Sequence, residues 1–146
     1  MKSLGFNVSL STNGILLNEY IIKFLKNNIL GLSISLDGLE NTHNYLRQSD
    51  VFNKTLENIK LCKKNNIKAL CIKTAVYKKN LNKLKDLYEI IKNIEPDEWH
   101  LFAVEPIGRG EINKKEILSL MEYNILCDFV DKIRNNKLPR GKPTRY

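Results

Sequence analysis

Apolar and polar residues alternate along two short stretches of the sequence, which is the pattern of a strand that buries one of its faces. Residues 7–12 alternate in this way and stop at Asn13-Gly14, and residues 32–36 alternate and stop at Asp37-Gly38. Two further strands are predicted at about 67–77 and at 99–104. Each predicted strand is followed by a polar or glycine-containing turn, so the strands mark four repeated units.

Apolar residues at spacings of three and four predict a helix after each strand. These helices are expected at about 18–28, from Phe52 onward, at about 81–94 and at about 114–135, with a loop between Gly38 and Phe52. The first helix is expected to bury four residues, Tyr20, Ile21, Phe24 and Leu25. Residues 1–137 are then one domain, and the Pro- and Gly-containing segment 138–146 is a basic linker or tail.

Alternating strands and helices predict an α/β protein with parallel strands, either a doubly wound open sheet or part of a β/α barrel. The central strands of an open sheet are apolar on both faces. Here Ser33, Ser35 and Asp37 oppose Leu32, Ile34 and Leu36 within one strand. One aliphatic face and one small, polar face favour a partial barrel with a polar interior. Four strands leave unpaired edges, which complete domains usually cover, so a piece of a larger barrel is expected.

Composition narrows the classes of function. The 146 residues carry a net charge of +8, but 19 of the 24 cations are Lys, which fall singly or in pairs on predicted helices. No basic stripe is interleaved with aromatic residues, so nucleic-acid binding is not expected. No apolar run is long enough for a membrane helix, and no secretory signal is indicated. Cys62, Cys71 and Cys127 form no paired motif, which predicts structural cysteines, buried and reduced, in a cytoplasmic protein.

The ends of the predicted strands carry an ordered set of polar motifs. Ser-Thr-Asn-Gly at 11–14 is followed by Ser-Leu-Asp-Gly at 35–38, then by His43 to Arg47, and later by Glu-Pro-Ile-Gly-Arg at 105–109. This order and spacing resembles the radical S-adenosylmethionine (SAM) enzymes. The resemblance is to the branch with a C-terminal auxiliary-cluster (SPASM) domain, which includes anaerobic sulfatase-maturing enzymes and peptide maturases. It covers roughly residues 7–135.

The resemblance implies a fold and a chemistry. The chain would hold strands three to six of a six-stranded partial barrel. The family binds SAM and a [4Fe–4S] cluster, and it generates a 5′-deoxyadenosyl radical that abstracts hydrogen, here from a peptide or protein substrate. A reductant such as ferredoxin or flavodoxin is a further implied partner. The family's Cys-x-x-x-Cys-x-x-Cys and Gly-Gly-Glu motifs do not occur in this sequence, so the chain is expected to be inactive alone.

By resemblance, the SAM contacts would be Ser35, Asp37, Arg47 and Glu105. Strand parity independently points Ser35 toward the polar face, where its small hydroxyl lets a polar ligand approach. Arg47, in the predicted loop, could hold a carboxylate bidentately. Asp37 could orient the turn through backbone amides.

Substrate contacts would be Thr12 and Asn13, which end the first strand, and Lys73, which should point into the polar cavity. Parity favours Asn13 over Thr12 as the inward side chain. His43 is expected to fix its loop through a backbone hydrogen bond. No residue of the chain is predicted to bind a metal.

Two other interpretations remain open. The chain could be a cluster-free binding module, or a subunit that completes a barrel with another chain. It could also be an unrelated small α/β enzyme with Asp37, His43 or Glu105 as acid–base groups, although no nucleophile or phosphate loop accompanies them.

Overall fold

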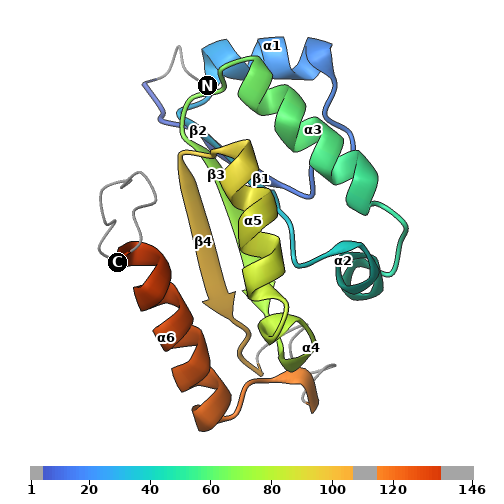
Figure 1. The fold of residues 1–146 in the computed structure, drawn as a ribbon. Coiled ribbons are helices and arrows are strands. Elements are labelled where there is room, and N and C mark those ends of the chain that lie inside the picture. The colour runs from blue at the N-terminus through green and yellow to red at the C-terminus, as the bar shows by residue number, and fades with distance from the viewer. Residues whose placement is uncertain (1–4, 107–114, 136–146) are drawn as a thin grey trace.

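Four parallel strands form the centre of the computed structural model, which describes residues 5–106 and 115–135. The strands are β1 (Ser9–Thr12), β2 (Gly31–Ser35), β3 (Leu70–Val76) and β4 (Glu98–Ala103). Their order in the sheet follows their order in the sequence (Figure 1). Each strand therefore pairs with the next one through a helical crossover, as the alternating units predict.

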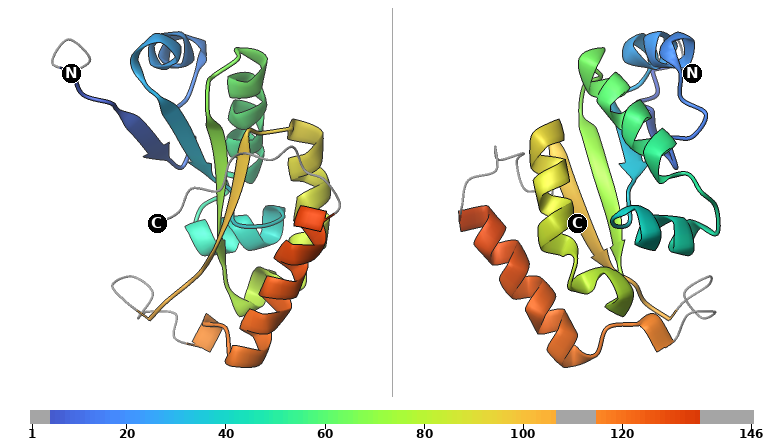
Figure 2. Two further views of the ribbon diagram at one scale, coloured as in Figure 1. Left: turned by 90° about the vertical axis from the view of Figure 1, so that its left-hand side faces the viewer. Right: turned by 45° about the vertical axis from the view of Figure 1, so that its right-hand side comes forward.

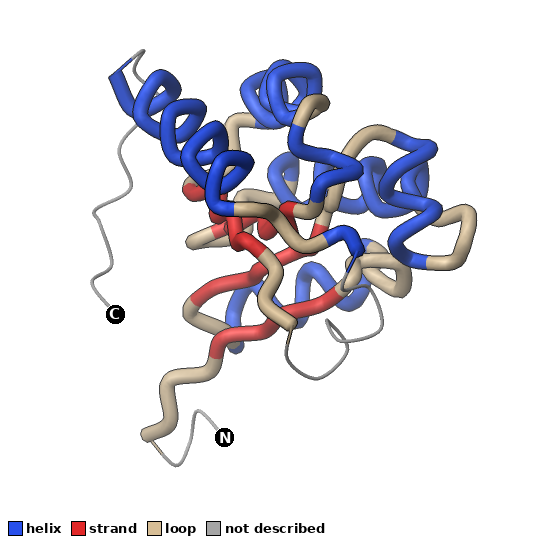
Figure 3. The backbone as a smooth tube through the Cα atoms, turned by 90° about the horizontal axis from the view of Figure 1, so that it is seen from below, coloured by secondary structure: helices blue, strands red, loops and turns tan. Residues whose placement is uncertain are grey.

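Helices cover one side of this sheet. They are α1 (Glu19–Asn28), α2 (Glu40–Arg47), α3 (Phe52–Lys64), α4 (Lys78–Leu81), α5 (Leu84–Ile94) and α6 (Leu120–Asn135). Figure 2 shows α3, α5 and α6 on the same side of the strands. Seen from below, the strands follow an arc with helices along its outer side (Figure 3). The arrangement is that of a partial barrel and not of a doubly wound sheet.

Strand register separates the two faces of the sheet. Leu32 pairs with Leu70 and Ile34 with Ile72, and all four side chains are completely buried beneath the helices. On the other face Ser33 pairs with Cys71 and Ser35 with Lys73. This second face, the open face, is the predicted polar interior. The expected α/β partial barrel is thus confirmed.

The first helix begins where the sequence predicts but buries a different face. The Asn18 side chain caps α1 by accepting a hydrogen bond from the Ile21 amide at 2.9 Å. Ile22 and Leu25 are buried, whereas the side chains of Tyr20 and Phe24 are 82% and 61% exposed. The prediction that Tyr20 and Phe24 are buried is wrong, because α1 packs on the sheet through the side defined by Ile22.

The segment between Gly38 and Phe52 is mainly helical, which corrects the predicted loop. Helix α2 is polar and has no apolar stripe, so periodicity gives no signal for it. Its fully buried His43 holds it to the end of β2. It ends at Gln48 in the left-handed conformation, with a φ of 53°. A tertiary contact, and not sequence periodicity, forms this helix.

Three other boundaries differ from those predicted. The third strand begins at Leu70, after Ala69 with a φ of 48°. The helical region that follows it is divided into α4 and α5, and the last helix begins at Leu120. The predicted segment 138–146 and the turn at 107–109 lie outside the described residues. Within 5–106 and 115–135, no helix has both the length and the apolar character needed to cross a bilayer.

Candidate functional site

Asp37 lies directly after β2 and connects four parts of the fold. Its side chain is almost fully buried, at 4% exposure of the residue. One carboxylate oxygen accepts a hydrogen bond from the Ala75 amide of β3 at 3.0 Å, and the other contacts Nη2 of Arg47 at 2.5 Å. The expectation that the Asp37 carboxylate accepts from backbone amides holds for one amide, which belongs to β3 and not to the turn after β2. We call Asp37, His43, Arg47 and Asn80 the carboxyl-end cluster.

His43 fixes α2 to the end of β2. Its Nδ1 accepts a hydrogen bond from the Asp37 amide at 3.0 Å, and its ring meets that of Phe52 edge-on at 6.0 Å. Burial lowers the pKa of His43 from 6.5 to about 4; the Asp37 carboxylate opposes this shift and Arg47 adds to it. The imidazole is therefore neutral at pH 7, as an acceptor at Nδ1 must be. The prediction that His43 fixes its segment through a backbone hydrogen bond is confirmed.

Asn80 completes the cluster from α4 and has no counterpart among the predicted site residues. It is completely buried. Its amide nitrogen donates to the carbonyls of Asp37 and Ala75 at 2.6 and 2.7 Å, and its oxygen accepts from the Tyr77 amide at 2.8 Å. One side chain therefore joins the ends of β2 and β3. An Asn in a polar turn after a strand is too common to indicate such a role.

Arg47 lies on α2 and not in a loop. The guanidinium is about one-third exposed and pairs with Asp37. Its Nε is buried and has no hydrogen-bond partner among the described residues. A buried donor without an acceptor costs free energy, so native structures usually satisfy it. Arg47 therefore has one donor that the described residues leave unsatisfied.

Ser35 and Lys73 lie side by side on the open face. They are Cα partners in the register of β2 and β3, and both are half-buried. Within residues 5–106 and 115–135, the Ser35 hydroxyl makes no side-chain hydrogen bond. The Lys73 ammonium lies 5.9 Å from the ring centroid of Phe102 on β4. The open face therefore offers a hydroxyl and a cation next to the carboxyl-end cluster.

Thr12 and Asn13 end β1 in different ways. Thr12 pairs with Ile34, so it belongs to the helix-covered face, and its hydroxyl accepts from the Gly14 amide at 3.1 Å. Asn13 is exposed, and its side chain accepts from the Ile15 amide at 3.3 Å. Gly14 has a φ of +81°, and a Cβ there would lie 2.8 Å from Cγ2 of Ile34. Only glycine lets this turn pass so close to the core.

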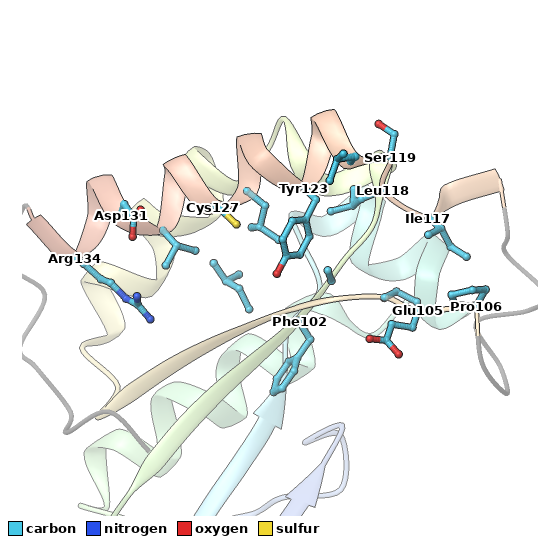
Figure 4. A pocket seen from close by; sticks show the side chains of 16 residues that line it. Phe102, Glu105, Pro106, Ile117, Leu118, Ser119, Tyr123, Cys127, Asp131 and Arg134 are labelled. Atoms are coloured by element: carbon cyan, nitrogen blue, oxygen red, sulfur yellow. The ribbon is translucent and has the colours of Figure 1, made fainter. Parts of the chain in front are cut away.

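Glu105 follows β4, which lies two strands along the sheet from β2 and Ser35. It is exposed, beyond the end of β4. With Phe102, Tyr123 and Arg134 it lines a cleft of about 860 Å³ between β4 and α6 (Figure 4). Neither Ser35 nor Asp37 lines this cleft. Strand register thus places Ser35 beside Lys73, an ion pair joins Asp37 to Arg47, and Glu105 lines the cleft between β4 and α6.

The cysteines fit the predicted structural role only in part. Cys62 and Cys71 are buried, and burial raises the pKa of the Cys62 thiol to about 11 and also raises that of Cys71. Cys127 is exposed on α6, so its predicted burial is wrong. The apolar spacing of α6 fails there because the helix contacts the sheet along a narrow side that includes Leu126 and Ile133. All three thiols are free of disulfides.

Known proteins with similar sequences are longer than this chain. An AdoMet-dependent heme synthase of Methanosarcina barkeri is 34% identical over 138 residues, which are 92% of this chain and 39% of that protein. A probable GTP 3′,8-cyclase of Saccharolobus solfataricus is 28% identical, over 99% of this chain and 47% of that protein. The chain spans about two-fifths to one-half of the length of these curated relatives.

Solved structures share the fold. The anSMEcpe protein with bound AdoMet superposes with a TM-score of 0.71 and 24% identity, over 90% of this chain and 39% of that one. The same protein with bound AdoMet and the Kp18Cys peptide gives a TM-score of 0.68 and 25% identity, over 82% of this chain and 34% of that one. The sequence model of the radical SAM superfamily matches residues 1–92, which are more than half of the chain. This chain therefore belongs to the radical SAM superfamily.

Proposed function

We propose that this chain forms the SAM-binding wall and part of the substrate wall of a radical SAM enzyme that modifies a peptide or protein. The observation that carries the proposal is the ion pair of Asp37 with the one-third exposed guanidinium of Arg47, just beyond the carboxyl end of β2, the strand whose last residue is Ser35. The [4Fe–4S] ligands would come from a segment other than these residues. The chain alone would then be inactive in catalysis.

The residues present suit SAM as a ligand. Its methionyl carboxylate can accept a hydrogen bond from the exposed part of the Arg47 guanidinium, which Asp37 holds in place through the 2.5 Å contact with Nη2. Its hydroxyl groups can pair with the Ser35 hydroxyl, which donates and accepts. A hydrogen bond from a charged guanidinium to a carboxylate is stronger than one between neutral hydroxyls. Arg47 should therefore contribute more to the affinity for SAM than Ser35.

Bound SAM would supply the 5′-deoxyadenosyl radical when the cluster receives an electron from a carrier such as ferredoxin or flavodoxin. The contribution of this chain is to bind and orient the reactants and to limit access of water. Its three thiols lie far apart in the sequence and do not form the cysteine triplet. The free thiols are in keeping with a reducing compartment such as the cytoplasm.

The β1 edge supports packing against a further strand-bearing segment, of the same or of another polypeptide. Leu10 on this edge strand is 36% exposed, Leu16 is 81% exposed and Tyr20 is 82% exposed. An unpaired strand edge and exposed apolar side chains both favour association. In a barrel with further strands, one of them would pair with the free edge of β1.

A peptide substrate is supported by the solved structures of anSMEcpe, which hold AdoMet together with the Cp18Cys and Kp18Cys peptides. The names of the other two relatives, an AdoMet-dependent heme synthase and a probable GTP 3′,8-cyclase, indicate reactions on substrates that are not peptides. The substrate class should therefore be tested by comparing the binding of a peptide with that of GTP.

SAM binding by the 146-residue chain tests the first part, with equilibrium dialysis of labelled SAM. Arg47→Lys should weaken binding about tenfold, because an ammonium group cannot hold a carboxylate bidentately as a guanidinium can. Ser35→Ala should weaken it several-fold. The matched controls Arg134→Lys and Ser9→Ala change exposed residues and should leave the Kd unaltered. Circular dichroism confirms that each variant is folded.

Two results would contradict SAM binding at this site. One is the absence of saturable binding up to about 1 mM SAM, the upper end of common affinities for enzyme substrates. The other is a Kd that responds to the control substitutions as strongly as to Arg47→Lys and Ser35→Ala. For the substrate class, the Kp18Cys peptide and GTP would be titrated in the presence of SAM. The peptide should bind saturably and GTP should not, and the reverse preference would refute a peptide substrate.

A further inference from the structure

A second group of polar side chains lies on the open face, toward the amino ends of β3 and β4. Cys71 of β3 is the Cα partner of Glu98 on β4, and His100 follows two residues along the same strand. Residues two apart on a strand share a face, so all three side chains project to the same side. The Cys71 thiol is buried, and Glu98 and His100 are half-buried.

The three potential ligand atoms converge. The Cys71 sulfur, a Glu98 carboxylate oxygen and a His100 ring nitrogen all lie within 4.8 Å of one another. Nε2 of His100 is 2.9 Å from Oε2 of Glu98. A histidine–carboxylate pair accounts for this last contact, and the Cys71 thiol beside it donates a weak hydrogen bond to the Ile72 carbonyl at 3.6 Å. The donor set of sulfur, imidazole nitrogen and carboxylate oxygen is one that Zn²⁺ binds.

Size and charge also favour such an ion. Bonds of about 2.0–2.3 Å to a central zinc place neighbouring ligand atoms roughly 3.3–3.8 Å apart. Small changes of side-chain rotamer bring atoms within 4.8 Å into that range. A thiolate and a carboxylate with a neutral imidazole carry a charge of −2, which a divalent cation neutralises in this half-buried position. Loss of the thiol proton accompanies binding.

We propose that Cys71, Glu98 and His100 bind one Zn²⁺ ion on the open face of the sheet. Three protein ligands leave a fourth tetrahedral position, directed away from the sheet into the open side, as in zinc sites that bind water or a further ligand. Lys73, the Cα partner of His100, has its ammonium displaced toward the Phe102 ring, 5.9 Å from its centroid. The cation of Lys73 and the bound metal can therefore occupy the same face.

Sequence spacing alone gives no indication of this site. Glu98 and His100 are 27 and 29 residues beyond Cys71, and only the parallel register of β3 and β4 brings them together. The site involves none of the residues proposed to bind SAM, and it does not depend on the proposed function.

Metal binding would be measured on the metal-free 146-residue chain without SAM. Isothermal titration with Zn²⁺ should give one ion per chain, and Co²⁺ should report sulfur ligation through a thiolate-to-cobalt absorption band. Glu98→Gln and His100→Asn should each raise the Kd for Zn²⁺ more than about tenfold, because even second-shell changes have effects of that size. Mg²⁺, which prefers oxygen ligands, should not bind measurably.

Cys71→Ser should remove the cobalt–sulfur band, whereas Cys127→Ser, the matched control on the exposed face of α6, should retain it. Because Cys71 is buried, the half-buried Glu98 and His100 provide a second test that does not alter the core. Three outcomes would overturn the proposal: no saturable Zn²⁺ binding, a sulfur band that persists in Cys71→Ser, or Zn²⁺ affinity unchanged in both Glu98→Gln and His100→Asn.

Discussion

The middle of the sheet and its β1 edge differ sharply in how completely they are enclosed. In the middle, Ile34 and Ile72 are fully buried, and Asp37 has its carboxylate and backbone groups paired with β3, α2 and α4. In the edge region, formed by β1 and the following helix α1, Leu10 of β1 is 36% exposed and Tyr20 of α1 is 82% exposed. The side chains of β2 and β3 are thus buried and paired within this chain, whereas β1 has one edge without a strand beside it.

Residues in the middle of the sheet maintain the fold, whereas residues at the edge are exposed and can contact a partner. The carboxyl-end cluster orders α2 and so fixes the position of Arg47. The edge residues contribute little to the fold described here. Substitutions in the two regions should consequently have very different effects on the free energy of unfolding.

The largest effect is expected for Asp37→Ala. Removing the carboxylate leaves the Arg47 guanidinium and the Ala75 amide without their acceptor. The loss should be about 4 kcal/mol, from the low end of the cost of breaking a buried ion pair plus one unsatisfied amide. Urea denaturation followed by circular dichroism measures it.

Asp86→Ala is the matched control, because Asp86 is exposed and, among the residues that the structure describes, its ion-pair partner is Lys83 at 3.7 Å. Its effect should be below about 0.5 kcal/mol. Similar losses for the two variants would show that the carboxyl-end cluster does not hold the ends of β2 and β3 together.

An effect of about 3 kcal/mol is expected from protonation of His43. Its pKa is about 4 in the folded chain and 6.5 in the unfolded chain, so the unfolded state binds the proton more readily. The stabilising contribution of neutral His43 is complete above pH 6.5 and is lost as the pH falls toward 4. Urea unfolding at pH 7, 5.5 and 4 would follow this loss.

His43→Asn provides the comparison, since an Asn oxygen can accept from the Asp37 amide but does not titrate. The difference in unfolding free energy between wild type and variant should narrow as the pH falls. A parallel pH dependence in wild type and His43→Asn would refute the assignment to His43.

Much of the partial barrel was predictable, because the alternation of apolar and polar residues along a strand indicates which face of the sheet is buried. Ser33 and Ser35 alternate with Leu32 and Ile34, and the register places them accordingly. Helix α2 was not predictable, because its stability comes from His43 and Arg47 contacting Asp37 and not from an apolar stripe. Contacts of this kind depend on how the strand ends meet in space.

The candidate site follows the same rule. The inward direction of Ser35 could be predicted from alternation along one strand. The role of Asn80 required the position of α4 relative to two strands. Likewise, the proximity of Cys71 to His100 depends on pairing between β3 and β4. Sequence periodicity describes single elements, whereas these sites arise between them.

The smallest effect is expected at the β1 edge, despite the size of the side chains. Tyr20→Ser should change the unfolding free energy by less than about 0.5 kcal/mol, because its side chain is mostly in water. Ile22→Ala on the same helix removes a completely buried side chain and should cost about 3 kcal/mol. Self-association, measured by analytical ultracentrifugation, should fall in Tyr20→Ser because an exposed apolar contact is lost. A loss of stability in Tyr20→Ser as large as that in Ile22→Ala would mean that the edge supports the fold itself, and the contrast between the two regions would no longer hold.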